Sequence, residues 1–168
     1  MYSGQEGQQV RLNMNNMILT DETDIYTYFE IIEKAEAKSI LDIGMFLKRI
    51  GSVSRQVKDK EIPMGKMLVG VDCFSSIQCP VWTKIYDKIY SIDELFDSDS
   101  NETYELATVL HVQECMSNEI FVAMWKWLCS HVSYILTDVS IDSVGKMIKY
   151  DTELPIDVDG KKYWFITV

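Results

Sequence analysis

The chain has 168 residues, of which 47% are hydrophobic and 25% charged, and its formal net charge at pH 7 is −10. This length fits one domain with a sizeable core, and the composition is that of a globular protein and not of a disordered chain. The excess of negative charge repels nucleic-acid phosphates and anionic lipids, so it argues against both as partners. No hydrophobic run approaches the roughly 20 residues of a membrane helix, and we expect a cytoplasmic protein.

Metal binding is not predicted. Four cysteines and two histidines are spread along the chain without a Cys-x-x-Cys pair. Zinc sites need several thiolate or imidazole ligands at close spacing. We therefore expect no structural metal, and we expect the cysteines to be free thiols in a reducing compartment.

The N-terminal part of the chain divides into a polar segment and the start of a domain. Residues 1–19 are predicted to be a flexible segment, and residues 20–168 a single α/β domain. Thr20 begins a predicted helix that ends near residue 38, because apolar side chains recur every three or four residues. Those side chains are Ile25, Tyr28, Phe29, Ile32 and Ala35.

Two short apolar runs follow and each ends in an acid. Residues 39–43 (SILDI) and 67–72 (MLVGVD) are predicted to be buried strands of a parallel sheet. Residues 49–58 can form a helix between them, and Pro63 and Gly65 break regular structure before the second strand.

Further strands are predicted at residues 86–92, 103–112 and 132–140. Asn118 can cap a helix that runs to residue 129, with its apolar side chains Phe121, Trp125 and Leu128 on one face.

The chain ends in a predicted hairpin. Asp159 and Gly160 lie between β-branched and aromatic residues, which is a strong signal for a two-residue turn. Strands therefore alternate with helices until the last two strands, which close on this turn.

The ends of the first two strands indicate a nucleotide-binding βαβ unit. Asp42 and Gly44 end the first strand, and Asp72 ends the second. Ligands of such units bind at the carboxyl ends of parallel strands. We therefore expect the carboxylates of Asp42 and Asp72 to lie side by side on one edge of the sheet.

The order of these parts resembles the class I S-adenosylmethionine-dependent methyltransferases, over nearly all of the chain from Thr20 onward. Asp42 and Gly44 match the family's acid–x–Gly turn, and Asp72 matches the acid that holds the cofactor ribose. Asp93 lies where the family often has an acid near the adenine, and residues 109–114 (VLHVQE) are similar to the fourth strand of small-molecule methyltransferases.

This resemblance implies a Rossmann-like methyltransferase fold with S-adenosylmethionine as its cofactor. The sheet would have about seven mostly parallel strands, a C-terminal antiparallel hairpin and helices on both faces. A NAD-binding Rossmann domain is the nearest alternative, but it usually lacks an acid two residues before its first glycine, so Asp42 favours the methyltransferase fold.

The glycine motif is degenerate. Phe46 and Lys48 occupy the positions where the family has two further glycines. A glycine permits positive φ and close approach of the cofactor to the backbone, and a side chain removes both advantages. The Phe46 ring is expected in or beside the site of the cofactor's methionine part, where it weakens binding.

Lys48 and Arg49 permit another interpretation, because backbone N–H groups at a helix start attract anions. They could bind a carboxylate or phosphate, or be solvated cations. The alternatives to a methyltransferase are therefore a non-catalytic methyltransferase-like binding protein, and a nucleotide or nucleotide-sugar module that uses this pair.

His111 and Glu114 are the candidate catalytic residues. Both lie near the end of the fourth predicted strand, and a histidine can act as a general base near neutral pH. The pattern favours a core position for His111 inside the strand, whereas Glu114 follows the strand and faces the cleft. The sequence thus predicts methyl transfer to a small molecule, and leaves the oligomeric state open, a homodimer included.

Overall fold

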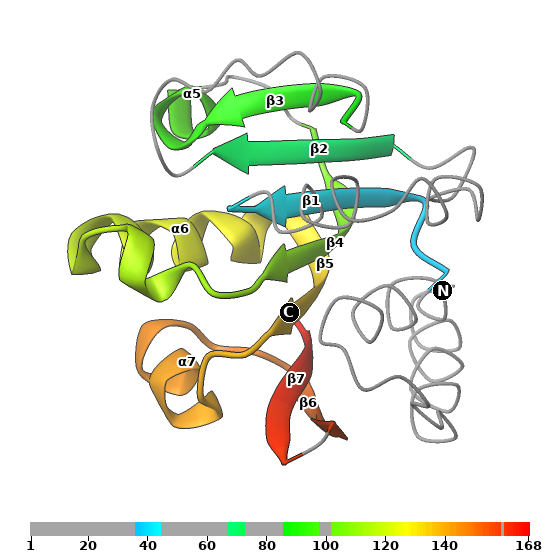
Figure 1. Cartoon of the computed structure of the whole chain (residues 1–168), viewed down its shortest axis with the longest axis vertical. Coiled ribbons are helices and arrows are strands. Elements are labelled where there is room, and N and C mark those ends of the chain that lie inside the picture. Colours follow the sequence, from blue (N-terminus) through cyan, green and yellow to red (C-terminus); the bar gives the residue numbers. More distant parts are fainter. Residues whose placement is uncertain (1–35, 45–66, 73–85, 98–101, 159) are drawn as a thin grey trace.

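The computed structural model describes residues 36–44, 67–72, 86–97, 102–158 and 160–168. Within these residues seven strands form one sheet in the order β3-β2-β1-β4-β5-β7-β6 (Figure 1). The strands are β1 (Ser39–Ile43), β2 (Met67–Asp72), β3 (Lys88–Ser91), β4 (Tyr104–Val109), β5 (Val132–Thr137), β6 (Thr152–Val158) and β7 (Lys161–Thr167).

The sheet is parallel from β3 to β5 and antiparallel at its other end. β1 pairs in parallel with β2 on one side and with β4 on the other. β7 pairs antiparallel with both β5 and β6. This confirms the predicted mixed sheet. The chain leaves β1 toward β2 and later returns to pair β4 against the other side of β1. The strand order therefore reverses between β1 and β4, and open α/β sheets bind ligands at such a point.

Three described helices pack on one face of the sheet: α5 (Ile92–Asp97), α6 (Asn118–His131) and α7 (Ile141–Met147). Their apolar side chains join those of the strands in a single buried cluster. From α6 the cluster takes Phe121, Met124, Trp125 and Leu128. The apolar stripe predicted for this helix is therefore confirmed, whereas the helices predicted at 20–38 and 49–58 lie mostly or wholly outside the described residues.

Several predicted boundaries are wrong. The fourth strand ends at Val109 instead of residue 112, and the fifth ends at Thr137 instead of residue 140. Ser117, and not Asn118, caps α6, because the Ser117 side chain accepts a hydrogen bond from the Ile120 backbone N–H. Helices α5 and α7 were not predicted.

The C-terminal hairpin is confirmed. Val158 of β6 pairs with Lys161 of β7, so two residues connect the strands. Gly160 adopts a φ of 78°. Glycine takes this left-handed conformation without the steric cost that a Cβ carries.

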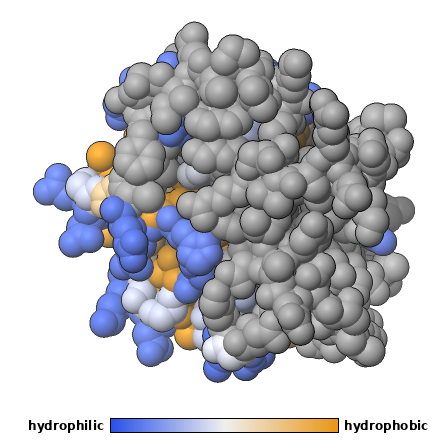
Figure 2. Space-filling model, in the orientation of Figure 1, coloured by the Kyte–Doolittle hydropathy of each residue, from blue (hydrophilic) through white to orange (hydrophobic). Residues whose placement is uncertain are grey.

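No helix in the described ranges is long and apolar enough to span a membrane. In the view of Figure 2, the visible described surface carries many hydrophilic side chains with hydrophobic atoms between them.

Candidate functional site

The carboxyl ends of four neighbouring strands meet along one edge of the sheet. Ile43 pairs with Val71 on β2 and with Val109 on β4, and Val109 pairs with Thr137 on β5. The residues at or just beyond these ends are Asp72, Gly44, His111 and Asp138, in the order β2, β1, β4, β5. The register therefore brings residues distant in the sequence to one edge.

Asp42 and Asp72 share a face of the sheet as well as this edge. Asp42 pairs with Gly70, so Asp72 lies two residues farther along the neighbouring strand. Side chains two residues apart point to the same face, and strand dimensions put the two Cα atoms roughly 8 Å apart. This is the arrangement expected from the sequence.

Asp42 is completely buried and accepts hydrogen bonds from two other segments of the chain. Its Oδ2 accepts a 2.6 Å hydrogen bond from the Tyr86 hydroxyl, and its Oδ1 accepts a 2.7 Å hydrogen bond from the Thr108 hydroxyl. A buried carboxylate needs such donors, because an unsatisfied one is costly. Asp42 thus links β1 to β4 and to the segment before β3, and its direct contact with a cofactor stays a prediction.

Gly44 turns the chain at the end of β1. Its N–H donates a 2.8 Å hydrogen bond to the Val71 carbonyl, and its φ is 81°. The turn needs this positive φ, which explains a glycine here. The motif positions Phe46, Lys48 and Arg49 lie outside the described residues.

Asp72 and Asp93 differ in their surroundings. Asp72 ends β2 and is only 8% exposed, whereas Asp93 is exposed in the first turn of α5. A carboxylate accepts several hydrogen bonds and donates none when ionised. Asp72 therefore suits the paired hydroxyls of a ribose. It lies at the carboxyl end of β2, one strand away from the reversal of strand order between β1 and β4.

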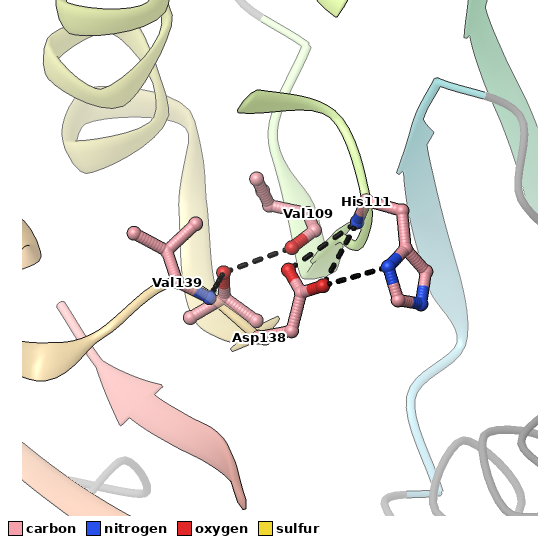
Figure 3. A network of polar contacts seen from close by, with 5 residues as sticks. Val109, His111, Asp138 and Val139 are labelled. Atoms are coloured by element: carbon pink, nitrogen blue, oxygen red, sulfur yellow. Dashed lines mark hydrogen bonds and ion pairs between the residues drawn. The ribbon is translucent and has the colours of Figure 1, made fainter. Parts of the chain in front are cut away.

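His111 lies beyond the end of β4 and is not a core residue. Its side chain is 43% exposed, so the predicted core position is wrong. Its Nδ1 lies 3.0 Å from Asp138 Oδ2 (Figure 3). Its backbone N–H donates to both oxygens of the same carboxylate, at 3.3 and 3.2 Å. Asp138 thus holds both the ring and the backbone of His111.

The segment that carries Asp138 is itself fixed. The hydroxyl of buried Thr137 donates a 2.8 Å hydrogen bond to the Val109 carbonyl and accepts a 3.1 Å hydrogen bond from the Val139 N–H (Figure 3). The ends of β4 and β5 are therefore joined by a side-chain hydrogen bond next to the His111–Asp138 pair.

Asp138 was not singled out from the sequence, although an acid directly after a buried parallel strand was the signal used for Asp72. The other candidate base, Glu114, is exposed in the 3-10 helix η2 (Gln113–Cys115), and its role stays a prediction. In the described part of the chain, no three His, Cys, Asp or Glu side chains come together to hold a metal ion.

No protein-family model and no curated protein matches this chain. Solved structures do match it. One is a provisionally assigned caffeoyl-CoA O-methyltransferase from Staphylococcus aureus, with a TM-score of 0.54 and 12% identity over 100% of this chain and 93% of that one. Another is a provisionally assigned O-methyltransferase from Klebsiella pneumoniae, with a TM-score of 0.53 and 11% identity over 97% and 89%.

This chain has a methyltransferase-like α/β fold. An rRNA methylase from Escherichia coli is also similar, with a TM-score of 0.52 and 14% identity over 84% of this chain. This chain spans 62% of that protein's length. At such identities the similarity shows the fold alone. The function of this methyltransferase-like domain must be inferred from its own residues.

Proposed function

We propose that this protein is an S-adenosylmethionine-dependent methyltransferase that acts on a small molecule. The observation that carries the proposal is the position of Asp72. It is a nearly buried acid at the end of β2, next to the Gly44 turn of β1, where the strand order reverses. Cofactor binding at that edge is typical of this sheet topology.

The described residues suit the cofactor. The Asp72 carboxylate would accept hydrogen bonds from the ribose hydroxyls, and the backbone at Gly44 would approach the cofactor without an intervening Cβ. Asp42 would contribute indirectly, by keeping β1 and β4 in register. Asp93 would lie near the adenine of the cofactor. When bound, S-adenosylmethionine supplies an electrophilic methyl group.

The charge of the edge supports a small acceptor that is neutral or cationic. Asp72, Asp93, Glu114 and Asp138 all follow or end strands there, in a chain of net charge −10. A polyanion such as RNA would be repelled by this arrangement. The substrates named for the similar structures are therefore not carried over to this chain.

Calorimetry with S-adenosylhomocysteine, the reaction product, tests the proposal. We expect one site with a micromolar dissociation constant, loss of binding in Asp72→Asn, and unchanged binding in Asp97→Asn, an exposed acid at the far end of α5.

Two other results would replace the proposal. Binding of NAD, phosphate or a nucleotide-sugar instead would favour the module that uses Lys48 and Arg49. No response to any adenosyl compound would favour a non-catalytic protein whose site Phe46 fills. A cytoplasmic location and a homodimer stay predictions.

A further inference from the structure

We propose that Tyr86 is a positioning residue of the cofactor site, and that it acts through the Asp42 carboxyl group to fix the Gly44 turn. The inference rests on the proposed function, because it names a residue that shapes the proposed site of S-adenosylmethionine without contacting the cofactor. It is carried by two buried hydrogen bonds that link the segment before β3 to β1 and β4.

The hydrogen bond from Tyr86 reaches past a whole strand. The sheet order is β3-β2-β1-β4, and Tyr86 lies two residues before the start of β3. Its hydroxyl donates at 2.6 Å to Asp42 Oδ2 on β1, and Asp42 Oδ1 accepts from the Thr108 hydroxyl on β4 at 2.7 Å. Tyr86 is 4% exposed and Asp42 is completely buried, so the bond lies in a low-dielectric interior where it is strong. One carboxyl group therefore connects three segments of the sheet.

Gly70 leaves room for this contact. Asp42 pairs with Gly70 on β2, and paired residues of neighbouring strands stand on the same face of the sheet. The Tyr86 side chain must cross β2 on that face to reach Asp42. A glycine inside a strand weakens the strand and often marks the close approach of another group. We therefore interpret Gly70 as the residue that lets the tyrosine cross.

The residue after Tyr86 fixes the backbone of the tyrosine. The Asp87 N–H donates a 2.8 Å hydrogen bond to the Leu68 carbonyl, and Asp87 Oδ2 accepts a 2.8 Å hydrogen bond from the Leu68 N–H. The backbone next to Tyr86 is thus attached to β2, while the Tyr86 hydroxyl is bonded to β1. A donor fixed in this way holds the Asp42 carboxyl group in one position.

The position of Asp42 bears directly on the proposed cofactor site. Asp42 stands two residues before Gly44, whose N–H donates a 2.8 Å hydrogen bond to the Val71 carbonyl. Val71 directly precedes Asp72. A shift of Asp42 would therefore change the spacing between Gly44 and Asp72, the residues proposed to contact the cofactor. Binding sites need supporting groups that hold their ligating residues in place.

Tyr86→Phe removes the hydroxyl and keeps the ring. We expect S-adenosylhomocysteine to bind the folded variant at least about fivefold more weakly than the wild type, the factor that corresponds to one net hydrogen bond. Tyr104→Phe is the matched control. Tyr104 is also 4% exposed and its hydroxyl also donates to a carboxyl group, that of Glu102, but it lies at the start of β4. Both variants should lose stability, and Tyr86→Phe alone should lose affinity.

Amide hydrogen exchange gives a second readout that needs no ligand. The Gly44 amide hydrogen should exchange faster in Tyr86→Phe, by more than the loss of global stability in urea denaturation explains. In Tyr104→Phe, exchange at Gly44 should follow global stability alone. A hydroxyl that only stabilises the fold would give this second pattern in both variants.

Unchanged affinity in Tyr86→Phe, or equal weakening in Tyr86→Phe and Tyr104→Phe, would overturn the positioning role. Exchange at Gly44 that only follows global stability would also overturn it. Should Tyr86→Phe not fold, Gly70→Ala replaces it. This variant keeps every hydroxyl and adds a methyl group where the tyrosine crosses β2, so it should weaken binding in the same way, and unweakened binding would refute the inference.

The proposed function and this inference fail in different ways. If the wild type binds S-adenosylhomocysteine and Tyr86→Phe binds it equally well, the positioning role is wrong and the proposed function stands. If the wild type does not bind the compound, both are wrong, even where exchange at Gly44 depends on Tyr86.

Discussion

The Thr108 hydroxyl donates a 2.7 Å hydrogen bond to Asp42 Oδ1, and both residues are completely buried. The bond joins two neighbouring parallel strands on the face that also carries Asp72. Together with the 2.6 Å hydrogen bond from Tyr86, it explains how a carboxylate is kept inside this sheet.

Thr108→Val removes that donor and nearly preserves the shape of the side chain. We expect a loss of about 1–3 kcal/mol in the free energy of unfolding, because the buried Asp42 carboxyl loses a hydrogen bond. Urea denaturation measures it, with Thr103→Val, an exposed threonine outside β4, as the matched control. In the double variant with Asp42→Asn, the loss in the free energy of unfolding should be smaller than the sum of the two single losses. A loss equal to that sum would show that the hydrogen bond contributes no stability.

The pair of Lys88 and Glu102 predicts a pH dependence of stability. The hydrogen bond from Lys88, and then that from Tyr104, hold the pKa of the Glu102 carboxyl below its ordinary value of 4.5. A carboxyl whose pKa is lower in the folded state adds stability above its unfolded pKa and loses it as the pH falls through the folded value.

Glu102→Gln should therefore lower the melting temperature at pH 7. The difference from the wild type should begin to shrink near pH 4.5 and vanish as the pH falls through the lower folded pKa of Glu102. The effect is expected to be small, because each of the two side chains is more than a third exposed to solvent. Lys88→Gln added to this variant should cost little more, since the pair is already broken. A difference that persists undiminished at low pH contradicts this explanation.

The first turn of α6 distinguishes the observed cap from the one that the sequence suggested. Ser117→Ala should cost about 1 kcal/mol, because the Ile120 N–H loses its acceptor. Asn118→Ala should be nearly neutral, since Asn118 is already helical. Chemical denaturation of the two variants compares them directly, and a larger loss for Asn118→Ala would restore the original assignment.

Two glycines in different conformations give opposite expectations. Gly160 has a φ of 78° with no atom within 4 Å of an added Cβ, so Gly160→Ala should cost about 1 kcal/mol through the backbone alone. Gly145 lies in α7, where an added Cβ meets Tyr150 at an ordinary 4.0 Å, so Gly145→Ala should stabilise by up to about 1 kcal/mol. Thermal unfolding checks both signs.

Much of the sheet was predictable because each early strand is an apolar run with an acid at its last position or the one before it. β1 and β2 have the predicted bounds for this reason. The end of β4 was not predictable in the same way. Leu110 and Val112 are buried and apolar, so their pattern predicted a longer strand. The left-handed backbone of His111 ends the strand before them.

The missed helices have a physical cause as well. α5 has 6 residues and α7 has 7, too few for a helical period to emerge in the 11 or more residues that such a pattern needs. The Asp138 contact depends on the pairing of β4 with β5, and no local pattern records which strands become neighbours. The sequence therefore indicated His111 as a candidate residue but not its contact with Asp138.

We propose that the carboxyl ends of β1, β2 and β3 bind an adenosyl cofactor. The most direct test is a titration of the ¹⁵N-labelled chain with S-adenosylhomocysteine, followed through the backbone amide signals. We expect shifts at Gly44, Asp72 and Asp93 and none at Gly160 in the distant hairpin. Saturable shifts confined to other parts of the molecule, or none at all, would contradict it.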